Sequence, residues 1–236
     1  MSKFTTNLSF QPTLDEMLKT GKAGTTSLPI TGASTTNNLI VIRNLHMELR
    51  AENTLEVGLA YGASALVFAQ THKDLGNDIE GCHVAIDPFQ ADMANSGLAA
   101  LDQAGLGNLV AHLEDFSDRA LPDLLARHRR FGLIYIDGSH LFEDVFVDVH
   151  YCAQLLEMGG IMLLDDSTHP DIAKVARFVR RNMQGVLDKV DLSPYRADNG
   201  KSLRYIVAQK LDRVQLTAFR KVDAGRRHWD AKLTQF

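Results

Sequence analysis

The pattern of apolar and polar residues changes at Thr54. From that residue onward, short and nearly continuous apolar runs alternate with longer segments in which apolar residues recur every three or four positions. Short apolar runs of this kind are typical of strands buried on both faces, and the longer segments are typical of amphipathic helices. The alternation predicts an α/β fold in which helices cover both faces of a mostly parallel, doubly wound sheet.

The expected elements can be assigned to definite stretches of the chain. The expected strands are Thr54–Val57, His83–Ile86, Leu109–Leu113, Leu133–Ile136, Ile161–Leu164, Val190–Leu192 and Leu203–Ala208. The expected helices between them are Ser64–His72, Gly97–Ala104, Ala120–Arg129, Leu141–Leu156 and Ile172–Met183. In such a sheet, ligands bind beyond the carboxyl ends of the strands, so the residues that follow each strand are the candidate site.

The residues before Thr54 follow a different pattern. Leu14–Thr20 predicts a short helix, and Lys22–Thr36 predicts a loop because it is rich in Gly, Ser and Thr. Leu39–Leu49 has a helical apolar stripe, with Asn37 or Asn38 as its N-cap. We therefore expect a helical and loop extension that covers the site (residues 1–50), an α/β ligand-binding domain (residues 51–210) and a C-terminal tail (residues 211–236).

The composition fits one such domain and excludes some classes of partner. The 236 residues are 45% hydrophobic, which is enough for one domain with a full core. The formal net charge of -4, from 25 basic and 29 acidic residues, gives no reason to expect a nucleic acid as partner. We expect no signal peptide, because Met1 to Phe10 has no apolar run long enough for one, and no stretch approaches the run of about 20 apolar residues that a membrane span requires. Cys82 and Cys152 lack metal-binding spacing and cannot build a disulfide framework, so we expect a cytoplasmic protein with reduced thiols.

A glycine-containing turn follows the first expected strand, in the segment Glu56-Val57-Gly58-Leu59-Ala60-Tyr61-Gly62-Ala63-Ser64. Two glycines in a turn from strand to helix allow the backbone to approach a ligand closely, although such a turn can also serve chain reversal alone. The spacing does not match the G-x-G-x-x-G fingerprint of dinucleotide folds, since position 60 is Ala and the glycines are four apart. We expect Glu56, which has no place in that fingerprint, to hold a cationic or amino group near the turn.

Polar segments also follow the second and third expected strands. Asp87-Pro88-Phe89 places an acid where it can accept hydrogen bonds from both hydroxyls of a ribose, although Asp-Pro can also start an ordinary turn. Phe89 could form an apolar wall for a base, or it could pack in the core. After the third strand, Glu114-Asp115-Phe116-Ser117 either lies at an adenine edge or caps the next helix.

Acidic residues follow the fourth and fifth expected strands as well. Asp137 begins the segment Asp137-Gly138-Ser139-His140, and Asp165 and Asp166 come directly after the fifth strand. Three unpaired carboxylates at neighbouring strand ends would repel one another, and a bound Mg²⁺ or similar divalent cation would remove that repulsion. The alternative is structural, with Asp137 in a turn and the other two acids capping a helix. His140 could face the same cleft and transfer a proton, or it could cap a helix.

Taken together, these motifs resemble those of class I S-adenosylmethionine (SAM)-dependent methyltransferases. The resemblance rests on Glu56-x-Gly58-x-x-x-Gly62, Asp87, Asp137-Gly138-Ser139-His140 and the run from Gly159 to Asp166. Within that superfamily the chain is similar to the small O-methyltransferase-like group, which includes the catechol type, the macrolide-sugar O-methyltransferases and the cephalosporin hydroxylase-like proteins. The resemblance extends from Thr36 to Gln209. It implies a Rossmann-like sheet of seven strands with the last strand antiparallel, and SAM lying over the glycine turn.

The resemblance also implies roles for individual residues. It places near SAM the glycine turn and the following strand ends, namely Glu56, Gly58, Ala60, Tyr61, Gly62, Ser64, Asp87, Pro88, Phe89, Asp115, Phe116, Ser117 and Asp137. Asp137, Asp165 and Asp166 match positions where metal-dependent relatives hold a divalent ion. His140 matches the histidine proposed as general base in the sugar O-methyltransferases, so His140 and Asp137 are the expected catalytic residues.

The expected function is therefore metal-assisted O-methylation of a hydroxyl on a small molecule. The alternatives are a methyltransferase that needs no metal, a SAM-binding relative of the hydroxylase-like proteins without transferase activity, and a nucleotide-dependent oxidoreductase. We expect the acceptor pocket to be built from Lys22–Thr36, the segment after Asp166 and Ser193–Lys201. A homo-oligomer is an expectation that rests on the family resemblance alone.

Overall fold

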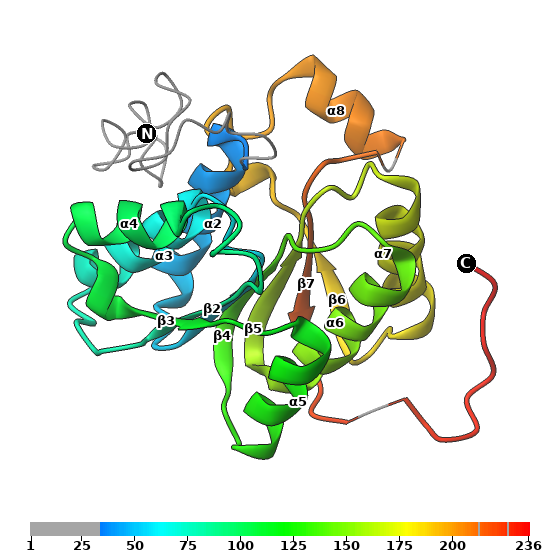
Figure 1. The fold of residues 1–236 in the computed structure, drawn as a ribbon. Helices are drawn as coiled ribbons and strands as arrows, with labels where there is room; N and C mark the ends of the chain where they lie inside the picture. The colour runs from blue at the N-terminus through cyan, green and yellow to red at the C-terminus, as the bar shows by residue number, and fades with distance from the viewer. Residues whose placement is uncertain (1–33, 212, 226) are drawn as a thin grey trace.

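A seven-stranded sheet forms the centre of the protein in the computed structural model, which describes residues 34–211, 213–225 and 227–236 (Figure 1). Its strands are β1 (Thr54–Val57), β2 (His83–Ile86), β3 (Val110–Leu113), β4 (Phe131–Ile136), β5 (Leu156–Leu164), β6 (Leu187–Val190) and β7 (Thr217–Lys221). They lie in the order β3-β2-β1-β4-β5-β7-β6, and β7 runs antiparallel to the other six. The predicted doubly wound sheet with an antiparallel last strand is confirmed.

Helices cover both faces of this sheet. They are α2 (Thr36–Leu49), α3 (Ala63–Asp74), α4 (Ser96–Gln103), α5 (Ser117–Ala126), α6 (Phe142–Leu155), α7 (Pro170–Asn182) and α8 (Leu203–Lys210), with short 3₁₀ turns at Gly107–Leu109 and Ser193–Tyr195. Alternate residues of β4 show how the faces divide, because Ile134 and Ile136 pack with α5, α6 and α7. Leu133 and Tyr135 point the other way and pack with α2 and α3. None of the described helices has the length and apolar character of a membrane span.

The last two predicted strands are wrong in position. Leu203–Ala208 lies in helix α8, and the segment that fills the sheet between β5 and β6 is Thr217–Lys221. A short apolar run does not distinguish a strand from a helix by its pattern alone, and α8 buries none of its residues. Strand β7 was not predicted because Arg220 and Lys221 interrupt its apolar pattern. The structure accommodates both charges, since Arg220 donates to the Gly159 carbonyl at 2.9 Å and Lys221 to the Leu156 carbonyl at 2.8 Å. The sixth strand, expected at Val190–Leu192, ends instead at Val190.

The two ends of the chain differ from expectation in smaller ways. The predicted helix Leu14–Thr20 and most of the predicted loop Lys22–Thr36 lie outside the described residues. Helix α2 is capped by Thr35, whose hydroxyl accepts a hydrogen bond from the Asn38 amide, rather than by Asn37 or Asn38. At the other end, the C-terminal segment runs beside α7, where the Thr234 amide donates to the Asn182 side chain at 2.7 Å (Figure 1).

Three histidines lie in the interior between α2, α3 and the sheet. His46, His72 and His83 have no exposed surface. Burial lowers the pKa of His46 from 6.5 to about 4 and that of His83 to about 3, because a charged imidazole would lose its hydration there. The folded protein therefore holds these rings neutral at physiological pH.

Mild acid should destabilise the protein through these rings. In the unfolded chain they titrate near 6.5, whereas their pKa values are lowered in the folded state, so below that pH the unfolded state binds more protons. Glu56 and Asp137 act in the opposite direction, because burial raises their pKa values in the folded state, so the contribution of the rings is the difference between variants. In urea titrations, His46→Phe should gain stability relative to the wild type as the pH falls from 7 to 5, whereas His150→Phe, at an exposed position, should keep the wild-type slope. A wild-type slope in His46→Phe would contradict this explanation.

Candidate functional site

The candidate site lies where the carboxyl ends of β1, β2, β4 and β5 meet. The chain order of the strands reverses between β1 and β4, which are paired in parallel with Val57 opposite Ile136. A crevice at such a switch point is the usual ligand site of an open α/β sheet. The predicted site residues that follow β1, β2, β4 and β5 are therefore brought to one edge of the sheet.

The glycine turn after β1 passes very close to its neighbours. Gly58 has φ +95°, and a Cβ at this position would lie 2.3 Å from the Asp137 carbonyl oxygen. Gly62 has φ +82°, and its Cβ would lie 2.9 Å from the Gly97 carbonyl oxygen of α4. Side chains would clash at both positions, so the glycines allow the turn to pack against β4 and α4 and to lead directly into α3. The N-terminus of α3, with its free amide groups, is thereby placed at the switch point.

Asp87 fixes the shape of this turn. Its Oδ2 accepts hydrogen bonds from the amides of Leu59 at 3.0 Å and Ala60 at 2.7 Å, and its Oδ1 accepts one from the Phe89 amide at 2.7 Å. These contacts help to hold Ala60 at φ +44°, a conformation that alanine rarely adopts. The predicted contact of Asp87 with a ribose stays a prediction, and the contacts of its carboxylate with the turn are an additional role that the sequence did not indicate.

Two aromatic rings lie beside Asp87. Phe89 and Phe116 make an edge-to-face pair with ring centroids 5.6 Å apart, and each is 48% exposed. Phe89 is therefore not a core residue, and the pair offers an apolar wall that a planar base could contact. Asp115 accepts a hydrogen bond from the Phe116 amide at 2.8 Å and pairs with Arg119, while Ser117 begins α5.

Glu56 is completely buried beneath the glycine turn. Its Oε1 lies 3.3 Å from Nε2 of His83, and neither carboxylate oxygen has a hydrogen-bond partner among the described residues. Burial raises the pKa of Glu56 to about 8, since a charged carboxylate is poorly solvated there. Tyr61 and Ser64 are buried next to this segment, and Pro88 follows Asp87.

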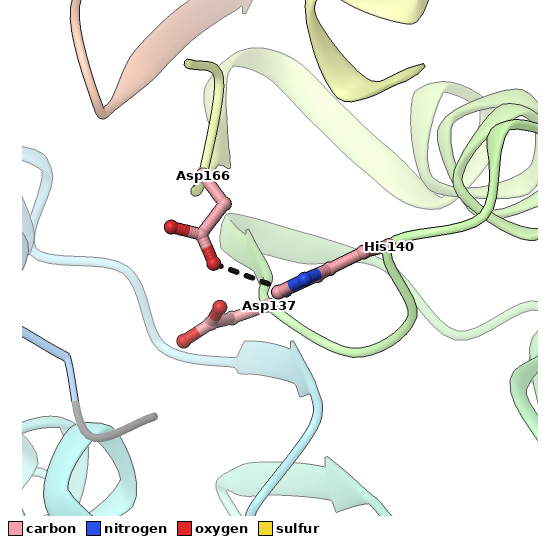
Figure 2. A group of neighbouring side chains, drawn as sticks. All are labelled: Asp137, His140 and Asp166. Atoms are coloured by element: carbon pink, nitrogen blue, oxygen red, sulfur yellow. Dashed lines mark ion pairs between the residues drawn. The ribbon is translucent and has the colours of Figure 1, made fainter. Parts of the chain in front are cut away.

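Asp137, His140 and Asp166 converge on the other side of the turn (Figure 2). One ligand atom from each lies within 4.8 Å of the others. Nε2 of His140 lies 3.0 Å from Oδ2 of Asp166, and Gln215 donates to Oδ1 of Asp166 at 2.8 Å. Asp166 has φ +46°, so a left-handed backbone turns its side chain toward His140. Such a group can bind a divalent cation through oxygen and nitrogen, or it can act as a histidine–aspartate pair in proton transfer.

Asp165 has a different environment from the other two acids. Its carboxylate accepts hydrogen bonds from Asn38 Nδ2, at 3.0 Å to each oxygen, and from the Tyr135 hydroxyl. It is only 3% exposed and does not belong to the group of Asp137, His140 and Asp166. No sequence pattern indicated that Asn38 or Gln215 contacts these acids, whereas Tyr135 could have been inferred because it precedes Asp137 by two positions in a strand.

The Tyr135 hydroxyl joins the two buried acids. It contacts both Asp165 and Asp137, the latter at 3.0 Å, and Ser34 also donates to Asp137 at 3.1 Å. A phenol has one proton, so it cannot donate to both carboxylates at once. Burial and the neighbouring Asp165 raise the pKa of Asp137, which favours a shared proton at this end of the sheet. A cation next to Asp137 would reverse that preference.

Comparison with known proteins agrees with this geometry. Residues 55–167 match the family model described as a methyltransferase domain. The O-methyltransferase ankF of Aspergillus thermomutatus is 27% identical over 155 residues, which are 66% of this chain and 61% of that protein. The chain thus spans less than two thirds of the length of this curated relative.

Solved structures share the fold at low sequence identity. The O-methyltransferase TomG from Streptomyces achromogenes, in complex with SAM, has a TM-score of 0.60 at 18% identity over 80% of this chain and 83% of its own. An O-methyltransferase from Bacillus cereus, in complex with S-adenosylhomocysteine (SAH), has a TM-score of 0.57 at 14% identity over 77% and 80%. These likenesses show that the chain shares the fold of these methyltransferases, and the match of residues 55–167 agrees with the resemblance stated from the sequence.

Gly58→Ala should disrupt the junction between β1 and β4. The added Cβ would meet backbone atoms of Asp137 that have no room to move, in addition to the strain of a positive φ. Gly76→Ala is a matched control, because Gly76 has φ +75° but no atom within 4 Å of its Cβ position. Chemical denaturation should show a loss of stability about 1–3 kcal/mol larger for Gly58→Ala than for Gly76→Ala. Equal losses would mean that the contact is not as tight as described.

Proposed function

We propose that this protein, whose residues 55–167 match a methyltransferase domain family, transfers the methyl group of SAM to a hydroxyl oxygen of a small molecule. The observation that carries the proposal is the position of Asp137, His140 and Asp166 directly beside the glycine turn. A methyl donor lying over that turn would present its sulfonium methyl to an acceptor held by these three side chains. Much of the rate enhancement would come from the alignment of the two reactants, which can lower a barrier by ~7–11 kcal/mol.

Several features support SAM as the cofactor. The α3 N-terminus and the close glycine turn suit a polar ligand head, and Phe89 and Phe116 suit an adenine ring. Asp87 is the proposed ribose acceptor, and Glu56 is proposed to face the amino group of the methionine part. The glycine spacing does not favour a dinucleotide, which argues against the oxidoreductase alternative.

His140 is the proposed general base. Asp166 accepts from its Nε2, which leaves Nδ1 to take the proton of the acceptor hydroxyl as the oxygen attacks the methyl carbon. Asp166 would orient the ring and stabilise the imidazolium that forms, and Gln215 would hold Asp166 in place. The side chain of His140 is half exposed, so an acceptor can reach it from solvent.

The same three residues fit a divalent cation. Two carboxylates and an imidazole are suitable ligands for Mg²⁺ or Mn²⁺, and such an ion would polarise the acceptor hydroxyl and lower its pKa. A nitrogen that binds a metal cannot at the same time accept a proton, so His140 would then be a ligand rather than the base. Asp165 already accepts hydrogen bonds from Asn38 and Tyr135. It would therefore not bind the ion but would orient the Tyr135 hydroxyl, which contacts Asp137.

We also propose a cytoplasmic location for the enzyme. Both Cys82 and Cys152 are buried free thiols, as expected in a reducing compartment. The acceptor would enter near the segment after Asp166 and the Ser193–Lys201 segment, which follow the carboxyl ends of β5 and β6.

Substitution of Asp166 should separate catalysis from cofactor binding. With a panel of catechols, phenols and aliphatic alcohols as acceptors, the wild type should form SAH from SAM, and Asp166→Ala should lower kcat by about 10²–10⁴-fold. SAH affinity, measured by calorimetry, should change little, because Asp166 lies on the acceptor side of the site. Asp188→Asn, on the exposed side of β6, is the control and should keep full activity. An equal loss of turnover and SAH affinity in Asp166→Ala would make this acid structural.

Chelation should decide between the two roles of His140. If a cation assists the reaction, EDTA should abolish turnover and added Mg²⁺ or Mn²⁺ should restore it. If His140 is the base, EDTA should have no effect and His140→Ala should lose activity that exogenous imidazole partly restores. Full activity of His140→Ala in the absence of any metal would contradict both roles.

A further inference from the structure

A line of polar side chains crosses the core from the surface to Glu56. Asn77 Nδ2 lies 2.9 Å from Nδ1 of His72, and Nε2 of His72 lies 2.8 Å from the Thr54 hydroxyl. The same hydroxyl lies 2.8 Å from Nδ1 of His83, whose Nε2 lies 3.3 Å from Glu56. Of these residues, Thr54, Glu56, His72 and His83 have no exposed surface.

The hydrogen bonds in this line can run in only one direction. Asn77 Nδ2 also donates to the Glu52 carbonyl at 2.8 Å, which fixes the amide nitrogen on the side facing His72. His72 must then accept at Nδ1 and carry its proton on Nε2, so it donates to Thr54. The single hydroxyl proton of Thr54 is left to donate to Nδ1 of His83. His83 consequently carries its own proton on Nε2, the nitrogen that faces Glu56.

Packing holds the two imidazoles in these orientations. Thr54 and His83 are direct partners in the register of β1 and β2. The Phe68 ring stacks on His83 with centroids 4.6 Å apart and an angle of 15°, and His46 packs edge-on against His72 at 4.3 Å. Burial lowers the pKa of both His72 and His83, so both rings are neutral and each has one N–H to donate.

The buried carboxylate at the end of the line is incompletely satisfied. Neither oxygen of Glu56 has a well-aligned hydrogen bond among the described residues, since His83 Nε2 is close but not aligned, and the neighbouring Ser64 hydroxyl only partly offsets the effect of burial on its pKa. Apart from His83 on β2, the groups that face Glu56 are the Ser64 hydroxyl on α3 and the acidic Asp87 at the end of β2. No Lys or Arg of the described part of the chain forms an ion pair with it. A buried carboxylate in this state is poised for a cation from outside the chain.

We propose that His83 is a positioning residue for cofactor binding, whose N–H, oriented through Thr54, His72 and Asn77, holds Glu56 as the carboxylate that receives the cofactor's ammonium group. This inference rests on the proposed function, because the ammonium group is that of the methionine part of SAM. The residues of the line touch no part of the reacting groups. They act only through Glu56, and so they affect binding of the ammonium group but not of the nucleoside part of the cofactor.

A pair of ligands tests this inference directly. SAH carries the ammonium group, whereas methylthioadenosine has the same nucleoside and thioether without it. Thr54→Val breaks the line in the middle with little change in volume, and Thr54→Ser keeps the hydroxyl. Calorimetry should show SAH affinity about tenfold weaker in Thr54→Val and nearly unchanged in Thr54→Ser, since the hydroxyl that keeps the His83 proton on Nε2, facing Glu56, is lost only in the first. Methylthioadenosine should bind equally to all three proteins.

A second variant and the pH dependence of SAH affinity distinguish a role in binding from a role in folding alone. His83→Phe keeps a ring against Phe68 and should show the same loss, specific to SAH. Because burial raises the pKa of Glu56 to about 8, binding the ammonium group must release a proton, so SAH affinity should rise between pH 6 and pH 7.5 by up to about tenfold per pH unit. Glu56→Gln should abolish this rise, and methylthioadenosine should show none.

Three results would overturn the inference. The first is an equal loss of SAH and methylthioadenosine in Thr54→Val and His83→Phe, which would make the line a support for the fold only. The second is wild-type SAH affinity in both variants. The third is failure of the wild-type protein to bind either nucleoside, which would overturn the proposed function and this inference with it.

Discussion

The close contact between Gly58 and the Asp137 backbone is the constraint on which the site depends. A Cβ at Gly58 would lie 2.3 Å from the Asp137 carbonyl oxygen, so the turn after β1 and the end of β4 can meet only because that position is glycine. The contact lies at the point where the strand order reverses, which is the usual ligand position in an open α/β sheet. It also brings the proposed cofactor-binding turn next to Asp137, and through Asp137 next to His140 and Asp166 (Figure 2).

Buried charge is distributed unequally around this contact. On the side of β1 and β2, Glu56 lies in the core with neutral histidines, and its pKa is raised by burial. On the side of β4 and β5, Asp137 and Asp165 share the Tyr135 hydroxyl, and burial raises the pKa of Asp137 as well. Both arrangements are costly for the isolated protein and are relieved by positive charge. Positive charge would stabilise both groups of buried acids. The proposed ammonium group would supply it at Glu56, and the proposed divalent ion would supply it at Asp137.

The sequence predicted the parts of this structure that follow from local pattern. Short apolar runs located β1 to β5, and two of the acids that follow these strands, Asp137 and Asp166, lie together with His140. The apolar pattern did not predict β7, because Arg220 and Lys221 interrupt it. These two side chains donate to backbone carbonyls, and the strand is recognised only from its pairing with β5 and β6. It also could not separate Asp165 from Asp166, because Asn38 and Gln215, which engage them, come from distant parts of the chain.

Thermal unfolding with SAH and, in parallel, with NAD⁺ tests the central claim most directly. A ligand at about 100 times its dissociation constant stabilises the native state by ~2.7 kcal/mol, which should raise the midpoint by several degrees in a domain of this size. We expect a shift with SAH and none with NAD⁺. No shift with SAH, in protein shown by mass spectrometry to be free of bound cofactor, would contradict the assignment of the glycine turn as a SAM site. A shift with NAD⁺ alone would point to nucleotide-dependent redox chemistry instead.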